Sequence, residues 1–313
     1  MHSIELIGDD AKLQLAELLR TNEGQTIRHI RGANVAHLAT LFSLEIGRRI
    51  KGVSLLAELG LTDEELVSLR ALDQLEDLTI GGRVIFESVP SGAFNSLERL
   101  CIYSNRLGNK GLRRIAQLPK LQELNTKNRD NRVTFEDLPE GAFKELQKLS
   151  TSENPLTEKG LKELAELPKL EQLDVSCCRV TFEDLSEGLF RRLQKLNASA
   201  TSLTDSGLAN LGSVPRLEEL EIRGCRVTFE DLPEGAFREL RRLDFEHPEV
   251  LGYAGIVAIA MLPRLKQLDI SDWNDVILED LPEGAFGQLE KLNMSESGAT
   301  YTQISNIANF PIL

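Results

Sequence analysis

The sequence predicts an α/β repeat protein: one stack of short parallel strands, with short helices or turns on its other side. Three observations lead to this fold class. The stretch RVTFEDLPEGAF occurs at 132–143 and at 226–237, with a near copy at 179–190 and looser copies that begin at 83 and 275. A leucine pair, L-x-x-L, recurs every 22 to 25 residues, and the residues after each pair alternate between two different patterns. Self-similarity at a fixed period of this length indicates one array of stacked repeats.

The first element of each repeat is predicted to be a strand. In the stretch LEELEI at 217–222, Leu220 and Ile222 alternate with Glu219 and Glu221, which is the pattern of a half-buried strand. The units open at Leu75, Leu97, Leu121, Leu146, Leu170, Leu193, Leu217, Leu240, Leu265 and Leu289. We therefore expect the strands to stack side by side into one parallel sheet.

The second element differs between the two kinds of unit, and in one kind it is predicted to be a short helix. In LTEKGLKELAEL, the residues Leu161, Leu164 and Leu167 recur at three-residue spacing, and Thr157 precedes them as a candidate helix cap. A strand and a helix in about 24 residues cannot bury both apolar faces alone, so neighbouring units must share the core.

In the other kind of unit, the repeated stretch RVTFEDLPEGAF forms the return limb after the strand. We expect its apolar side chains to point inward, namely Val227, Phe229, Leu232 and Phe237. Pro233 and Gly235 are typical of a turn. The acidic residues Glu230, Asp231 and Glu234 would then face water. The repeated text is accordingly interpreted as scaffold, and not as a cation site, because carboxylates spaced by apolar anchors do not converge on one point.

The array is predicted to cover 50–313, since Ile50 and Val53 form an opening pair, and 1–49 to hold degenerate N-terminal repeats or a cap. Two weaker pairs lie in that first part, Ile27 with Ile30 and Ile4 with Ile7. At the other end, ANFPIL repeats the close of AELPKL, so Leu313 stands where a further unit should begin. We expect that end of the stack to be unfinished, and buried in a dimer or continued in a longer protein.

The pattern L-x-x-L-x-L-x-x-N/C, present over nearly all of the chain, resembles that of leucine-rich repeat proteins. The resemblance implies a curved horseshoe, a solenoid with a parallel concave sheet and short helices or turns on the convex side. The helical units are similar to the short repeats of ribonuclease-inhibitor-like and GALA-type proteins. In the family, the ninth residue of a unit satisfies backbone groups in the turn after the strand. Here that position holds Asn105, Asn154, Cys178, Thr201, Cys225 and Ser297. Departures, which predict wider or irregular turns, occur at Arg83, Arg129, Pro248 and Trp273.

Charge and composition exclude several classes of partner. The net charge is −13 and no basic run is present, which argues against nucleic acid. No stretch reaches the roughly 18 to 20 apolar residues of a membrane span. The N-terminus lacks the pattern of a signal peptide. We therefore expect a cytoplasmic protein, with delivery into a host cell as an effector as the alternative.

The sequence contains no set of residues that is typical of a catalytic or metal site. The four histidines belong to distant units and stand beside no nucleophile motif. The four cysteines are too few and too irregular for a disulfide framework or a zinc motif. Cys178 and Cys225 lie two units apart, roughly 10 Å at a strand spacing near 4.8 Å, which is too far for a disulfide. The sequence predicts no enzyme, no cofactor and no metal.

The candidate site is the strand face, which we define as the third, fifth and seventh residues of each unit and expect to be concave. At the third position, acid or amide alternates with base from one unit to the next, so unlike charges should be neighbours. At the fifth and seventh positions, acidic residues gather in the C-terminal units. The predicted partner-binding residues are Asp174, Glu219, Glu221, Arg223, Arg242, Asp244, Glu246 and Asp269.

These features predict a non-enzymatic protein–protein interaction module of the adaptor, inhibitor or bacterial effector type. The predicted partner is a protein that is basic where it meets the C-terminal half of the strand face. The alternative is the substrate-recognition part of an enzyme complex, such as a ubiquitin ligase. A pull-down from cell lysate beside a hydrolase and ligase activity panel discriminates between the two.

Overall fold

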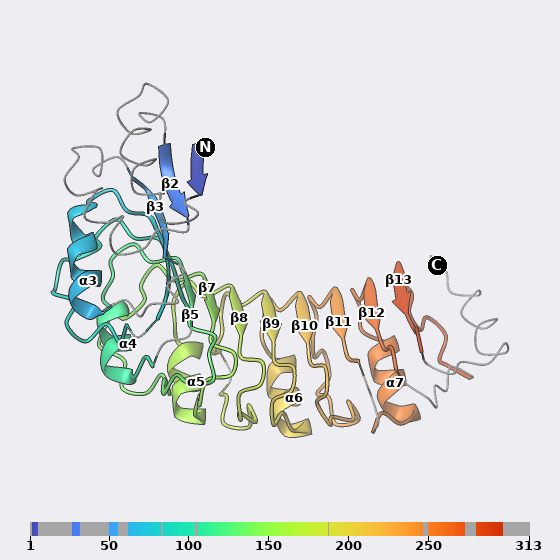
Figure 1. Cartoon of the computed structure of the whole chain (residues 1–313). Coiled ribbons are helices and arrows are strands. Elements are labelled where there is room, and N and C mark those ends of the chain that lie inside the picture. Colours follow the sequence, from blue (N-terminus) through green and yellow to red (C-terminus); the bar gives the residue numbers. More distant parts are fainter. Residues whose placement is uncertain are drawn as a thin grey trace. The chain divides into compact units, whose positions relative to one another are not determined.

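The computed structural model describes residues 2–5, 27–31, 50–55, 62–82, 84–103, 106–186, 188–246, 250–272 and 280–296. The chain forms two compact units, Met1–Ser150 (unit 1) and Thr151–Leu313 (unit 2). In each unit the strands lie side by side in chain order, with short helices on the opposite side of the repeats (Figure 1).

Unit 1 contains parallel strands that each pair with the next one along the chain. They are β1 (His2–Glu5), β2 (Ile27–Arg31), β3 (Gly52–Leu55), β4 (Asp77–Gly81), β5 (Arg99–Tyr103), β6 (Glu123–Asn125) and β7 (Lys148–Ser150). Its described helices are α3 (Asp63–Ser68), followed by the 3-10 turn η3 (Leu69–Ala71), and α4 (Asn109–Ile115).

Unit 2 repeats this arrangement with parallel neighbouring strands. They are β8 (Gln172–Asp174), β9 (Lys195–Asn197), β10 (Glu219–Glu221), β11 (Arg242–Asp244), β12 (Gln267–Asp269) and β13 (Lys291–Asn293). Its described helices are α5 (Glu158–Ala165), α6 (Asp205–Gly212) and α7 (Tyr253–Ala260). As predicted, the helices occur in one kind of unit and the RVTFEDLPEGAF-type limbs contain turns.

The strand register follows the leucine pattern. Leu220 pairs in register with Leu196 on one side and with Leu243 on the other. One N-terminal prediction is wrong: Ile4, expected to open its unit, is in register with Ile30, which is the fourth residue of the next unit. The first unit is therefore shifted by three residues, and Ile7 lies outside the described residues. The division at 49/50 stays a prediction.

The core holds the leucine ladder, two phenylalanines from each of the four return limbs that begin at 83, 132, 179 and 226, and Phe286 from the fifth limb. In the copy at 226–237, Phe229 and Phe237 are each 1% exposed, and both have a positive φ, 62° and 52°. A bulky residue rarely adopts this left-handed backbone, which costs about 1 to 2 kcal/mol. Burial of the ring, worth about 1.5 to 3 kcal/mol, offsets that cost. Val227 is buried as predicted, whereas Leu232 is only half-buried.

The helices are packed tightly between neighbouring units, and a glycine makes this possible. A Cβ on Gly207 in α6 would overlap the carbonyl oxygen of Thr181 in the preceding unit. On its other side, the Asp205 carboxylate accepts a hydrogen bond from the backbone N–H of Thr228 in the following unit at 2.6 Å. Thr204 caps α6, and Thr157 caps α5 as predicted, each accepting from a backbone N–H at 3.1 Å. Helix α6 thus links the repeats on both sides of it.

Ninth-position side chains satisfy the turns after the strands. Asn154 Nδ2 donates to the carbonyl oxygen of Thr151 at 3.0 Å, and Cys225 Sγ donates to that of Ala198 at 3.2 Å. In the unit where Arg129 departs from the pattern, Asn131 takes this role two residues later and donates to Thr126 O at 2.7 Å. The predicted wider turn is confirmed there. The departures at Arg83, Pro248 and Trp273, and the pattern residues Asn105 and Ser297, lie outside the described residues.

Candidate strand-face binding site

The third-position residues form the predicted alternating row. In unit 1, Arg99 pairs with Asp77, and Lys148 Nζ lies 2.8 Å from Glu123 Oε1. In unit 2, Lys195 Nζ lies 2.6 Å from Glu219 Oε1. Both partners of the last pair are substantially exposed, so the pair stabilises the fold by about 0 to 1 kcal/mol. Its main effect is to neutralise Glu219 locally.

Fifth-position residues have a structural role that the sequence analysis missed. The Oδ1 atom of Asp174 accepts a hydrogen bond from the backbone N–H of Ser176 at 3.0 Å, and Asp269 accepts from Ser271 at 3.1 Å. Asn197 makes the same bond to the residue two positions on, Ser199, at 3.0 Å. These Asx turns end the strands. The signal was present in the sequence as [DN]-x-S immediately after the strand leucine in β8, β9, β12 and β13.

Five of the predicted site residues come together around β10 and β11. Arg223 binds the Asp244 carboxylate through two nitrogens, with Nε to Oδ1 at 2.8 Å and Nη2 to Oδ2 at 2.5 Å. Arg223 Nη1 also lies 3.3 Å from Glu246. Arg242 Nη2 lies 3.7 Å from Asp244 and 3.9 Å from Glu221. The two guanidinium groups therefore lie among three carboxylates, and we call these residues the β10–β11 charge cluster.

The cluster is unevenly exposed, which the sequence did not reveal. The Asp244 side chain is only 1% exposed, whereas those of Arg223 and Arg242 are 47% and 43% exposed. Asp244 thus acts as a buried anchor for Arg223. The hydrogen bond to Asp244 raises the pKa of the Arg223 guanidinium, so Arg223 stays charged. The groups accessible to a partner are Glu221, Glu246 and the two arginines.

The remaining predicted residues lie beside this cluster or apart from it. Asp269 follows Asp244 in register on β12 and also accepts hydrogen bonds from Ser271 Oγ at 2.8 Å and Asn293 Nδ2 at 2.9 Å. Burial opposes ionisation of Asp269, but these hydrogen bonds outweigh burial and lower its pKa. Asp174 belongs to β8, two strands from Glu221. Whether any of these residues contacts a partner stays a prediction.

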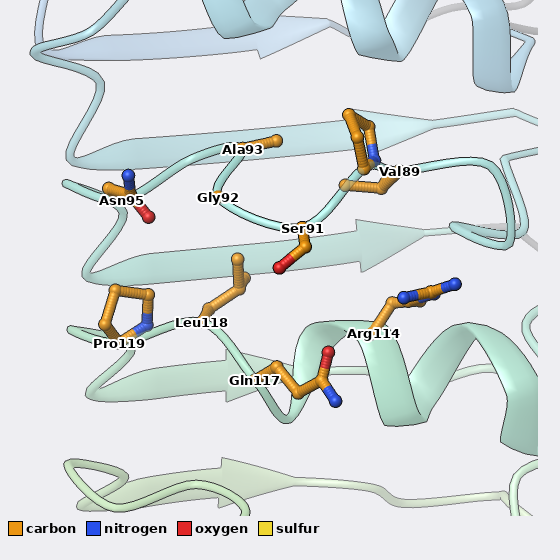
Figure 2. Close-up of a pocket in the computed structure, with 10 residues that line it drawn as sticks. Val89, Ser91, Gly92, Ala93, Asn95, Arg114, Gln117, Leu118 and Pro119 are labelled. Carbon is orange, nitrogen blue, oxygen red and sulfur yellow. The ribbon is translucent and has the colours of Figure 1, made fainter.

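Two features of the described residues outside the strand face bear on other kinds of site. A small pocket of about 40 Å³ in unit 1 lies between a return limb and the end of α4 (Figure 2). Its one charged lining residue is Arg114, with no acid, histidine or thiol beside it. No group of three or more histidine, cysteine, aspartate or glutamate side chains in the described part could hold a metal ion. No helix in that part is long and apolar enough to span a membrane.

The cysteines are free thiols in distinct environments. Cys178 and Cys225 are buried, and Cys177 is exposed. Burial raises the pKa of the Cys178 thiol to about 12 and also raises the pKa of Cys225. Thiols of this kind are poor nucleophiles. Their contact with backbone carbonyls accounts for their presence in the repeats.

Solved structures with the same architecture settle the fold. TLR13, solved in complex with ssRNA13, is 21% identical and superposes with a TM-score of 0.63 over 94% of this chain and 48% of its own. The chain has the leucine-rich-repeat fold. An internalin from Listeria monocytogenes is 15% identical, with a TM-score of 0.61 over 97% of this chain and 94% of its own. Toll in the Toll–Spatzle complex of Drosophila is 14% identical, with a TM-score of 0.58 over 98% and 42%.

This leucine-rich-repeat chain spans about half the length of TLR13 and Toll, and nearly all of the internalin. No family model and no curated protein sequence matches it. The kinship with ribonuclease-inhibitor-like or GALA-type repeats therefore stays a prediction.

Proposed function

We propose that this chain is a non-enzymatic protein-interaction module whose strand face, centred on the β10–β11 charge cluster, recognises a protein partner that is basic at the contact. The observation that supports this proposal is the placement of half-exposed Glu221 and Glu246 around Arg223, which is itself held by the buried carboxylate of Asp244. A rigid, preorganised charge arrangement loses little side-chain freedom on binding.

The balance of charge supports the sign of the partner. Carboxylates outnumber cations on the strand face of unit 2, because Asp174 and Asp269 add to the cluster while only Lys195, Lys291 and the two arginines oppose them. Such a face speeds the encounter with a basic partner and selects against acidic ones. The same charge disfavours nucleic acid as a ligand.

The compartment is part of the proposal. Free buried thiols at Cys178 and Cys225 are compatible with the reducing cytoplasm, either of the source cell or of a host cell that receives the protein as an effector.

The test is capture from cell lysate with wild type and with Glu221→Lys/Glu246→Lys, followed by affinity measurements on the protein recovered. We expect the double reversal to weaken binding by at least about tenfold at low salt, and less at high salt. Glu166→Lys/Asp184→Lys makes the same change of net charge away from the strand face and should bind normally. If the double reversal leaves binding unchanged while Tyr103→Ala in unit 1 weakens it, the proposal has assigned the site to the wrong unit. Intrinsic hydrolase or ligase activity of the purified chain would contradict the non-enzymatic assignment.

A further inference from the structure

Helix α7 differs from the other helices of unit 2 in the chemistry of its outer face. Its buried positions are Gly255, Ile256, Ile259 and Ala260, as expected from the repeat. At about 100° per residue, Tyr253, Val257 and Met261 lie at roughly 0°, 40° and 80° around the helix axis, and Ala254 and Ala258 at roughly 100° and 140°. These five side chains form one continuous face directed away from the core, and none of them is charged.

The equivalent face of α5 is strongly polar. The positions of Ala254 and Met261 in α7 correspond to Lys159 and Glu166 in α5, and to Ser206 and Ser213 in α6. All four of these polar residues are exposed. The repeat therefore does not require apolar residues there, and the apolar face of α7 needs another explanation.

The solvent exposure of large hydrophobic side chains points to α7 as well. Among the described residues, the large hydrophobic side chains that are exposed are Tyr103, Val250, Tyr253 and Met261, at 44%, 40%, 42% and 49%. Three of these belong to α7 or to the residues next to its ends, since Val250 precedes the helix and Met261 caps it. Scattered exposed hydrophobic residues need no explanation, but a cluster surrounded by polar residues is typical of an interaction site.

The limbs on both sides of α7 supply an acidic rim. Tyr253 OH donates to the carbonyl oxygen of Asp280 at 2.5 Å, and a Cβ on Gly252 would lie 3.1 Å from Glu230 Oε1, so both limbs adjoin the helix. The exposed acids of the two limbs are Glu230, Asp231, Glu234, Asp280 and Glu283. The limb at 226–237 carries one cation, the exposed Arg226 at its first position, and 280–290 carries none.

Two further arginines in these repeats have bonding partners. Arg238 Nε donates to the carbonyl oxygen of Gly235 at 3.1 Å, and Arg264 pairs with Glu239. Five exposed acids outnumber Arg226 and Arg238, so the rim of the α7 surface carries a net negative charge. We define the α7 surface as Val250, Tyr253, Ala254, Val257, Ala258 and Met261 together with this rim.

We propose that the α7 surface is a second binding site, which takes an amphipathic basic segment: a helix or extended peptide with apolar side chains flanked by lysine or arginine. Apolar residues would cover Tyr253 and Met261, and the flanking cations would meet the acidic rim. Charge complementarity selects this occupant over a second copy of the chain, because two α7 surfaces face to face would bring two acidic rims together in a protein of net charge −13.

The experiment uses a fluorescent 18-residue peptide of leucine and lysine, with leucine at helical spacing, and the full chain. Binding is measured by anisotropy against a peptide with glutamate in place of lysine and against a scrambled leucine–lysine peptide. The test variant is Ala254→Lys/Met261→Glu, which leaves the net charge unchanged and gives α7 the residues of α5. The matched control is Ser206→Lys/Ser213→Glu, which makes the same change on α6. Circular dichroism and thermal melting verify that both variants fold.

We expect the leucine–lysine helix to bind wild type and the α6 variant alike, and the α7 variant at least about tenfold more weakly. Asp231→Asn/Glu283→Gln should also weaken binding, with a reduced salt dependence. Glu221→Lys should leave it unchanged, which separates this site from the strand face. Equal binding to wild type and the α7 variant, or equal binding of the glutamate peptide, would overturn the proposal. So would a dimer in light scattering that the α7 variant dissociates, or binding to phosphatidylcholine vesicles that it abolishes.

Discussion

Arg223 is the residue on which the strand face of unit 2 depends, because it holds the carboxylate of Asp244 under its own guanidinium. The Asp244 side chain is 1% exposed and both of its oxygens accept from Arg223. A buried charge that loses its partner is costly.

We therefore predict that Arg223→Ala lowers the free energy of unfolding by about 2 kcal/mol, since a charged hydrogen bond is lost and Asp244 is left without its main partner. Urea unfolding at pH 7 measures this loss. Lys195→Ala, which breaks the exposed pair with Glu219, should cost less than about 1 kcal/mol. A loss for Arg223→Ala no larger than for Lys195→Ala would contradict the role of Arg223 as a cover for a buried acid.

Asp269 should make stability depend on pH in the acid range. Its pKa in the folded protein lies below the ordinary value of 3.8, so the folded state releases this proton more readily than the unfolded chain. The contribution to stability is present above pH 3.8 and is lost as the pH falls through the folded pKa.

Asp269→Asn removes this contribution while keeping the Asx turn, because Asn197 and Asn293 make the same backbone bond at equivalent positions. We expect the variant to be less stable than wild type at pH 7, with the difference closing as the pH approaches 3. Unfolding curves at several pH values test this. A difference that persists unchanged at pH 3 would show that the charge of Asp269 is not its cause.

At the scale of elements, the helix glycines determine how closely the repeats pack. Because a Cβ at Gly207 would overlap Thr181 O and would lie 3.1 Å from Phe182 Cβ, the backbones of α6 and the preceding limb approach at a distance that only glycine permits. Gly111 faces the carbonyl oxygen of Ile85 and Gly255 that of Thr228, each in the preceding repeat.

Gly207→Ala is predicted to destabilise the protein by about 1 to 3 kcal/mol through overpacking. Gly108→Thr serves as the comparison, since that cap position has nothing within 4 Å and α4 has no side-chain cap. The threonine should stabilise by a few tenths of a kcal/mol. Thermal melts of both variants provide the measurement, and similar melting temperatures would refute the packing argument.

A second element-level prediction concerns the inward position after β7. Thr151 is fully buried there, and its hydroxyl oxygen has no hydrogen-bond partner among the described residues. The equivalent residue of the next unit is Val175.

Thr151→Val keeps the shape of the side chain and removes the unsatisfied hydroxyl, so it should raise the free energy of unfolding by about 1 kcal/mol. Thr204→Val, which removes a helix cap, should lower it by about 1 kcal/mol. Chemical denaturation of the two variants should therefore show shifts of opposite sign. A destabilised Thr151→Val would mean that the hydroxyl is satisfied by water.

At the scale of the whole molecule, the question is whether unit 1 and unit 2 unfold together. A repeat array gains much of its stability from the interfaces between neighbours, so an unbroken array unfolds cooperatively. The recurrence of the leucine pair every 22 to 25 residues on both sides of 150/151 predicts such an array.

We expect differential scanning calorimetry to give one transition, with equal calorimetric and van't Hoff enthalpies. Gly207→Ala, in unit 2, should lower the temperature of the entire transition. Two transitions, of which only one responds to the variant, would identify unit 1 and unit 2 as independent folding units and would contradict a single array over 50–313.

The sequence by itself determined the repeat, the strand register in most units and the parts that each repeat contains. These features depend on residues close together in the chain: the spacing of Leu217 and Leu220, the Thr157 cap, and the alternation of Glu219 with Arg242 along a period of constant length. Local patterns of this kind do not depend on how the repeats pack against each other. The leucine-rich-repeat fold could therefore be predicted from the sequence.

Only the tertiary structure decided how the site is exposed. Asp244 and Glu246 look alike in the sequence, yet Arg223 buries one and leaves the other half-exposed. Asn131 takes over the turn hydrogen bond of the ninth residue although it stands two positions later in the sequence. Phe229 adopts a left-handed backbone conformation, which the sequence pattern does not reveal. These outcomes depend on which atoms of neighbouring units approach each other, and burial and charge pairing at such contacts follow from distances in space that no one-dimensional spacing specifies.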